Sequence, residues 1–150
     1  MWNHKKSTDL SILLCFTAIG ILAVLIPAAP FLLKWYTNAR YVEFPVKMFT
    51  AVLICFYTSA VVAFLALYEL VRMLFKIRKG NAFCKENVRS LRVLSWCCAT
   101  VAVITAVGTF FVIPFIFVAA AALFMSIILR VVKNVMEYAV KLREENDLTI

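Results

Sequence analysis

Glycine, histidine and acidic residues are scarce in this sequence, and each shortage excludes a class of function. Three glycines in 150 residues are too few for a glycine-rich loop that cradles phosphate. His4 is the only histidine, which leaves little from which to build a nucleophile–base pair, so an enzyme is not expected. The five cysteines form no Cys-x-x-Cys motif and no metal-like pattern with His4. We therefore expect free cysteines packed as small apolar residues, with no metal, cofactor or disulfide.

Charged residues of either sign are also few, and this places the chain in a membrane. Only 16% of the residues are charged and 65% are apolar, and the mean hydropathy is +0.95. A soluble chain is closer to half apolar and about a quarter charged. We expect one membrane domain spanning residues 1–150, with no separate soluble domain.

The net charge of +8 also raises the possibility of nucleic-acid binding. However, the basic residues flank apolar runs, as cytoplasmic membrane-flanking residues do. No basic stretch outside a membrane segment is interleaved with stacking aromatic residues. No direct contact with nucleic acid is expected.

Uncharged runs predict four membrane-spanning helices. Residues 10–33 are 24 residues without charge, about 36 Å as a helix, against a hydrocarbon core of about 30 Å. Residues 93–129 would be about 55 Å as one helix, so a turn near residues 108–114 is expected to divide them. The predicted spans are approximately residues 10–33, 47–68, 93–109 and 114–131.

The first span leaves two alternatives open. Pro27 and Pro30 are expected to end or kink its far end. A cleaved signal peptide is the rival interpretation, but the apolar stretch is longer than a usual signal core. Residues 34–47 are then predicted as a loop whose aromatic residues form an interfacial belt or, alternatively, a ligand-binding cluster. These aromatic residues are Trp35, Tyr36, Tyr41 and Phe44.

Residues 69–92 set the expected orientation, because they hold seven basic residues against two acidic ones. Basic residues prefer the cytoplasmic side of a membrane. Charges at helical spacing on both sides of Gly80-Asn81, a predicted helix stop, indicate two helical stems joined by a tight turn. The predicted fold is therefore an all-α integral membrane four-transmembrane-helix bundle. Both termini are cytoplasmic, as is the helical hairpin between helices 2 and 3.

Residues 130–150 are predicted to extend the last span as a cytoplasmic amphipathic helix and an acidic tail. Glu137 and Lys141 stand in the favourable i,i+4 order on its polar face. Beyond Glu145 an irregular end is expected. The apolar stripe at helical spacing consists of Val132, Val135, Met136, Ala139 and Leu142.

No charged residue lies within a predicted span, which argues against a proton-coupled or cation transporter. Glu69 is the nearest carboxylate, and an interfacial ion pair with Arg72 is the favoured interpretation. Residues 119–122 and Ser126 form a small-residue surface, expected to pack within the bundle rather than in a dimer. The Ser and Thr side chains in the spans are expected to bond the preceding helical turn, although a polar route is the alternative. They are Thr17, Thr58, Ser59, Thr100 and Thr105.

Two stretches carry a resemblance to a known family. Residues 80–87, GNAFCKEN, followed by Leu91-Arg92, resemble the linker signature of a family of small bacterial four-span membrane proteins. Residues 142–150, LREENDLTI, resemble its C-terminal signature, which is the more specific of the two. The family is Domain of Unknown Function 2975, and the resemblance covers essentially the whole chain. It implies a bacterial plasma-membrane protein without established activity. Members are often encoded beside a small helix-turn-helix regulator of the Cro type, which implies a shared pathway.

The leading functional hypothesis is an accessory or regulatory membrane protein with a cytoplasmic partner-binding surface. The expected partners are anionic lipid headgroups, a small DNA-binding regulator and further copies of the chain. Anionic lipid alone, at about 1 kcal/mol per basic residue, is the preferred explanation of the linker charges by themselves. The alternative is a small transporter or channel subunit for an apolar or amphipathic solute. The predicted interaction surface consists of Arg72, Lys76, Arg78, Lys79, Phe83, Lys85, Asn87, Arg89, Arg92, Leu142, Arg143, Glu144, Glu145, Asn146, Asp147 and Leu148.

Overall fold

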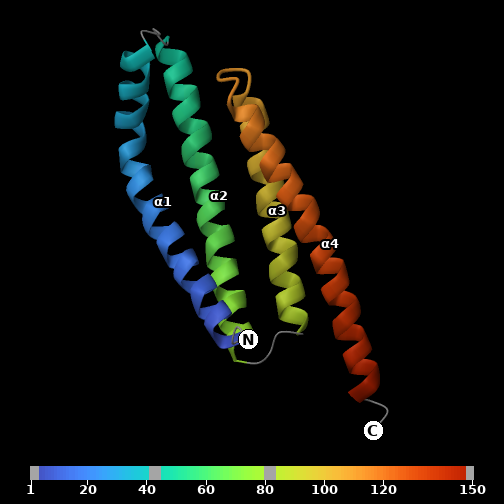
Figure 1. The fold of residues 1–150 in the computed structure, drawn as a ribbon. Helices are drawn as coiled ribbons and strands as arrows, with labels where there is room; N and C mark the ends of the chain where they lie inside the picture. The colour runs from blue at the N-terminus through green and yellow to red at the C-terminus, as the bar shows by residue number, and fades with distance from the viewer. Residues whose placement is uncertain (1–3, 41–44, 80–83, 148–150) are drawn as a thin grey trace.

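Four long helices make up the described part of the protein in a computed structural model (Figure 1). The structure describes residues 4–40, 45–79 and 84–147, and side chains for all of these except residues 4–6, 40 and 147. The helices are α1 (His4–Arg40), α2 (Val46–Arg78), α3 (Lys85–Gly108) and α4 (Phe115–Asp147). Each is long and apolar enough to cross a membrane. The prediction of an all-α fold with four candidate membrane spans is confirmed.

The helices run alternately up and down, so their polar termini gather at one end (Figure 1). We call this the charged end: it carries the start of α1, the end of α2, the start of α3 and the end of α4. The opposite end carries the connection from α1 to α2 and the turn between α3 and α4. Residues 93–129 are shared between two helices, because α3 ends at Gly108 and α4 begins at Phe115.

The helices pack in a row rather than as a closed bundle. Close backbone approach occurs between α1 and α2, between α2 and α3, and most extensively between α3 and α4. No described Cα atom of α1 lies within 8 Å of one in α4. The accessible surface is 10921 Å², against about 7,700 Å² for a compact soluble protein of the same mass. The predicted bundle is correct in its number of helices, but its first and last helices do not close the ring.

Helix α1 continues through Pro27 and Pro30, so of the two outcomes expected of these prolines, an end or a kink, the structure excludes the end. Pro30 has no N–H with which to bond the carbonyl of Ile26, four residues earlier. The hydroxyl of Tyr57 on α2 donates to this carbonyl oxygen at 3.3 Å. A neighbouring helix thus satisfies a group that proline leaves free, which is how membrane helices tolerate proline.

The predicted loop over residues 34–47 is largely helical. Helix α1 reaches Arg40, and Pro45 precedes the first residue of α2. Trp35 and Tyr36 therefore lie on the last turns of α1, 66% and 42% exposed, as side chains of an interfacial belt would be. Tyr41 and Phe44 lie outside the described residues.

Helices α3 and α4 are joined by small side chains and reciprocal hydrogen bonds. The hydroxyl of Ser95 donates to the carbonyl of Ser126 at 3.0 Å, and the hydroxyl of Ser126 donates to the carbonyl of Ser95 at 2.9 Å. Of the small-residue surface predicted over residues 119–122 and Ser126, Ala119 and Ser126 are buried against α3 and Ala122 is half-buried, whereas Ala120 and Ala121 are exposed. At the turn, a Cβ added to Gly108 would meet the Phe115 ring at 2.6 Å. Glycine therefore permits the close approach of the two helices.

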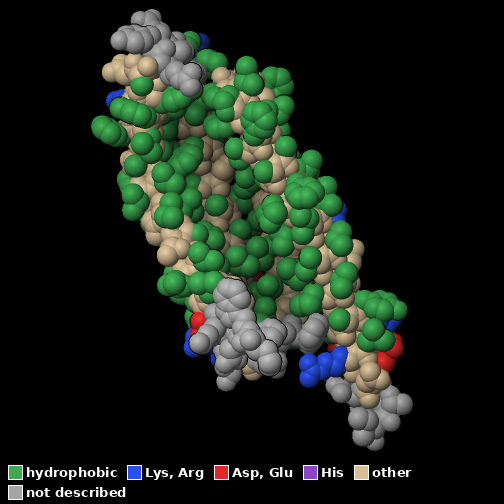
Figure 2. Space-filling view, viewed as in Figure 1, with side chains coloured by type: hydrophobic (Ala, Val, Ile, Leu, Met, Phe, Trp, Pro, Cys, Tyr) green, Lys and Arg blue, Asp and Glu red, His purple; other side chains and the backbone are tan. Residues whose placement is uncertain are grey.

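The outer surface is apolar along most of the helices (Figure 2). Large exposed apolar side chains occur on all four, including Leu13, Ile54, Val103 and Phe124. Lys, Arg, Asp and Glu gather mainly toward the charged end of the visible face (Figure 2). A surface of this kind is stable where lipid replaces water.

Candidate functional site

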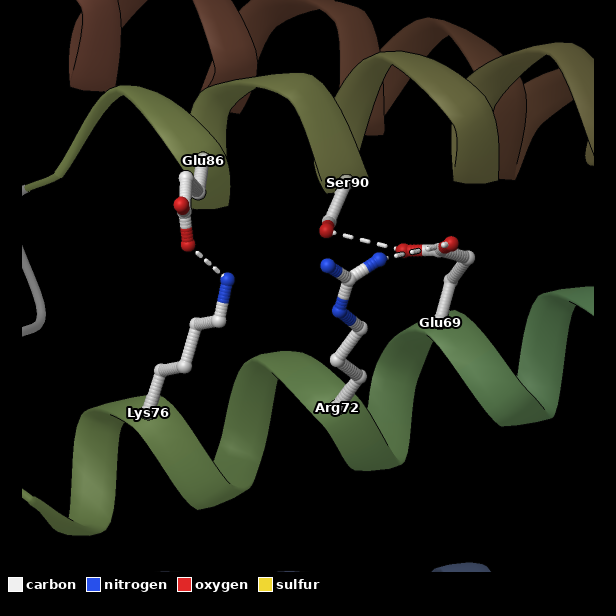
Figure 3. Close-up of polar contacts among 5 residues, drawn as sticks. All are labelled: Glu69, Arg72, Lys76, Glu86 and Ser90. Atoms are coloured by element: carbon white, nitrogen blue, oxygen red, sulfur yellow. Dashed lines mark hydrogen bonds and ion pairs between the residues drawn. The ribbon is translucent and has the colours of Figure 1, made fainter.

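Polar contacts between α2 and α3 dominate the middle of the charged end (Figure 3). Glu69, with a side chain 19% exposed, accepts a hydrogen bond from the hydroxyl of Ser90 at 2.9 Å. Its other carboxylate oxygen lies 3.8 Å from Arg72, so the predicted interfacial ion pair is present. Two turns further along α2, Lys76 pairs with Glu86. The charged face of α2 is therefore directed at α3.

Glu86 lies seven residues before the uncharged run of α3 begins at Val93, outside the apolar part of the span. The hydrogen bond from Lys76 and the charge of its ammonium lower the pKa of Glu86, and Arg72 contributes further. On α4, Lys133 lies 2.7 Å from Glu137 and lowers the pKa of that carboxyl in the same way. The i,i+4 partner of Glu137 in the structure is thus Lys133, whereas the sequence pattern indicates Lys141.

Ion pairs also connect the outer helices to the row at the charged end. Arg78 of α2 lies 3.3 Å from Asp9 of α1. Lys85 of α3 lies 2.8 Å from Glu144 of α4. The second contact joins two residues of the predicted interaction surface that are almost sixty positions apart in the sequence. The involvement of Asp9 had no signal in the sequence beyond its position ahead of the first span.

Most of the predicted interaction surface is exposed at the charged end. Asn87 is the exception, because its side chain is fully buried at the start of α3 and cannot contribute to an exposed surface. Lys76 is half-buried by its contact with α3. Phe83, Leu148 and the side chain of Asp147 lie outside the described residues. The exposed members are Arg72, Arg78, Lys79, Lys85, Arg89, Arg92, Leu142, Arg143, Glu144, Glu145 and Asn146.

A hollow of about 620 Å³ opens between the first turns of α3 and the last turns of α4. Its lining contains four basic side chains, two acidic ones and three valines, Val88, Val93 and Val140. The basic residues Lys85, Arg89 and Arg92 recur every three or four positions of α3, so they share the face that looks toward α4.

Helix α4 also presents an apolar stripe at the charged end that no described helix covers. Val131, Val135, Tyr138 and Leu142 are 56%, 64%, 69% and 49% exposed. They follow Arg130, so they lie beyond the uncharged part of the span. Met136 and Ala139 of the predicted stripe are instead half-buried, and Val140 is buried. Val131, Val135, Tyr138 and Leu142 are spaced by four, three and four residues, as positions on one helix face are. This spacing could have predicted from the sequence that Val131 and Tyr138 belong to the stripe.

Four of the five hydroxyl-bearing residues named from the sequence bond their own helix. The exception is Ser59, whose buried hydroxyl has no hydrogen-bond partner in the described part of the protein. Thr17, Thr58 and Thr100 each donate to a carbonyl three or four residues earlier, and Thr105 does the same. This confirms the interpretation that these threonines satisfy the preceding turn. A separate cavity of about 410 Å³ near the opposite end is lined by apolar and aromatic residues of α1 and α2, together with Val112 and Phe115.

Comparisons with known proteins find a family and a membrane protein that are similar to this chain. Residues 28–150 match the family described as "Protein of unknown function (DUF2975)". Over 165 aligned positions, covering 99% of each chain, the sequence is 26% identical to "Uncharacterized membrane protein YoaS" of Bacillus subtilis (strain 168). No solved structure matches the chain.

Proposed function

The chain belongs to the DUF2975 family of proteins of unknown function, and from this premise we propose that it is a membrane-embedded accessory or regulatory protein. In this proposal its charged end faces the cytoplasm of a bacterial cell and binds a protein partner there. The concentration of basic residues at that end supports the orientation. The protein would act by binding rather than by catalysis.

The exposed stripe on α4 carries the proposal. Its four side chains lie beyond the uncharged run, where lipid no longer supplies an apolar environment. Exposed apolar patches rimmed by charge are typical of protein–protein interaction sites. Anchors at positions i, i+4, i+7 and i+11 on one helix face fit a hydrophobic groove of a partner. The apolar side chains of the stripe would therefore anchor the partner protein, and the flanking charges would make the binding selective.

The charges beside the stripe are of both signs. Glu144 and Lys85 are paired across α3 and α4, and Arg89 and Arg143 are exposed nearby. Such a rim favours a partner with charges of both signs around an apolar groove. The partner that we propose is a small helix-turn-helix regulator, because the family resemblance implies a shared pathway with one.

Site-specific photocrosslinking in intact cells tests the proposal. A crosslinking amino acid replaces Tyr138 in the stripe or, as a control, Phe124, which lies two heptads earlier within the uncharged run. We expect the 138 position to capture the soluble regulator and the 124 position to capture none. Adding V135D and L142D should abolish the capture, because burying two carboxylates in the groove is unfavourable. Capture of no soluble protein from position 138 would refute the proposal.

The orientation has its own test. Protease added outside intact cells should leave the C-terminal segment intact if the charged end is cytoplasmic. Removal of the final residues would place that end outside and refute the cytoplasmic assignment, whatever the crosslinking shows.

The apolar cavity at the opposite end supports the second candidate, a transporter or channel subunit for an apolar solute. Its volume of about 410 Å³ lies within the usual range for small-molecule sites, and its lining includes Trp35 and Phe56. A cysteine at position 56 should react with a water-soluble reagent if solute enters there from water, and protection by apolar solutes would favour transport. An unreactive cysteine would count against it.

A further inference from the structure

A second hollow lies beside the first, between α3 and α4, and it has a distinct chemistry. Its volume is about 280 Å³, and Arg92 lines both hollows. The smaller one is lined by three basic residues and no acidic one. Its lining consists of Arg92, Ser95, Trp96, Arg130, Lys133 and Asn134.

Two of the three cations form no ion pair with a described carboxylate, although the charge of Arg92 contributes to lowering the pKa of Glu137. Within the described ranges, neither Arg92 nor Arg130 forms an ion pair, whereas Lys133 is paired with Glu137 at 2.7 Å. The Arg130 guanidinium instead lies over the Trp96 ring, 5.5 Å from its centroid. Placing Arg92 and Arg130 around one hollow brings like charges together, which is unfavourable unless an anion lies between them. Guanidinium groups bind phosphate oxygens through paired hydrogen bonds.

The hollow lies at the border of the apolar zone. Arg92 directly precedes the uncharged run that begins at Val93, and Arg130 directly follows the run that ends at Leu129. Trp96, 60% exposed, is the kind of side chain that settles at headgroup level. Inside the border, Ile127 and, about three turns beyond Arg92, Val103 expose apolar surface on which acyl chains can lie. The phosphate of a glycerophospholipid would therefore occupy this depth, with its chains against the helices.

We infer that this hollow, the Arg92–Arg130 site, binds the headgroup phosphate of an anionic glycerophospholipid such as phosphatidylglycerol. Basic pockets between membrane helices near a bilayer surface bind headgroups of this class. Arg92 and Arg130 hold the phosphate, Lys133 and Asn134 extend the polar lining, and Trp96 orders Arg130. Ser95 is already engaged with Ser126 and contributes to the wall of the hollow. The inference requires only that the chain crosses a membrane, so it is independent of the protein partner proposed above.

Quenching of Trp96 fluorescence tests the inference in the full chain. Trp2 and Trp35 are replaced by Phe, which leaves Trp96 as the one tryptophan of the sequence. The protein is reconstituted in phosphatidylcholine vesicles that contain lipids brominated near the headgroup end of their acyl chains. We expect brominated phosphatidylglycerol to quench at a mole fraction at least about tenfold lower than brominated phosphatidylcholine. About fivefold preference per cation follows from about 1 kcal/mol for each basic residue at the surface.

The R92Q/R130Q variant should lose this preference, whereas R92K/R130K should retain a preference for phosphatidylglycerol. Retention by the lysine variant shows that the replaced positions still allow folding. The matched control is R72Q/K79Q, which removes two charges from α2 at the same end but outside the lining of the hollow. An equal loss in the control variant would mean that only the general surface potential attracts lipid, and the inference would be overturned. Abolition of the preference by millimolar inorganic phosphate would assign the hollow to free phosphate and overturn the lipid assignment.

Discussion

The hydrogen bond between Tyr57 and the carbonyl that Pro30 leaves free predicts a specific energetic coupling between α1 and α2. Replacing Tyr57 by Phe removes the hydroxyl but keeps the ring, which packs edge-on against Phe56 at a centroid distance of 5.9 Å. Interhelical hydrogen bonds in membrane proteins average about 0.6 kcal/mol, with a maximum of about 1.7 kcal/mol. Because the oxygen–oxygen distance of 3.3 Å is long, we expect Tyr57→Phe to lower the free energy of unfolding by about 0.6 kcal/mol.

The refuting experiment uses Pro30→Ala. Alanine restores an N–H that can bond the Ile26 carbonyl within α1, so Tyr57→Phe should then cost less than about 0.3 kcal/mol. Tyr68→Phe is the control, since Tyr68 is 64% exposed and its hydroxyl makes no described hydrogen bond. Unfolding in mixed micelles of increasing SDS content, followed by circular dichroism, measures all variants. Equal costs of Tyr57→Phe with and without Pro30 would show that the hydroxyl does not compensate for proline.

Two further predictions concern the opposite and the charged ends. Gly108→Ala should lower the free energy of unfolding by about 1–3 kcal/mol, because the added Cβ would meet the Phe115 ring at 2.6 Å. Gly20→Ala is the control, because a Cβ added to Gly20 would have no heavy atom of another described helix within 4 Å and should not destabilise the protein. Equal losses of stability in the two variants would contradict this prediction. Glu86 should titrate below the usual carboxyl range in a ¹³C NMR titration, and Lys76→Gln should raise its pKa. The pKa of Glu86 is lowered in the folded protein. The Lys76–Glu86 contact therefore stabilises the fold at any pH above the ordinary carboxyl pKa, and this stabilisation is lost as the pH falls through the lowered pKa of Glu86.

Much of the candidate site could be predicted from the spacing of charged residues in the sequence. The charged residues of α2 and α3 recur at helical intervals, so Glu69, Lys76 and Arg89 were correctly placed on continuous helices. The burial of Asn87 was not predicted, because an Asn early in a charged helix has the same local pattern whether it faces water or a neighbour. The exposed stripe on α4 was only half predicted. Which apolar positions of an amphipathic helix are covered depends on where the neighbouring helix ends.

The sequence by itself determined that the chain has four helices long and apolar enough to cross a membrane, with their charged termini at one end. The reason is that the number of spans depends on the length of uncharged runs relative to bilayer thickness, which is a local property. Only the tertiary structure decided that α1 continues past Pro30, that Ser95 pairs with Ser126, and that α1 and α4 remain apart. Lipid is as apolar as leucine, so hydropathy does not specify how each helix is rotated or which helix lies beside it. The rotation and the neighbours of each helix are set by close packing of small residues and by a few interhelical hydrogen bonds. The residues that form these contacts are far apart in the sequence.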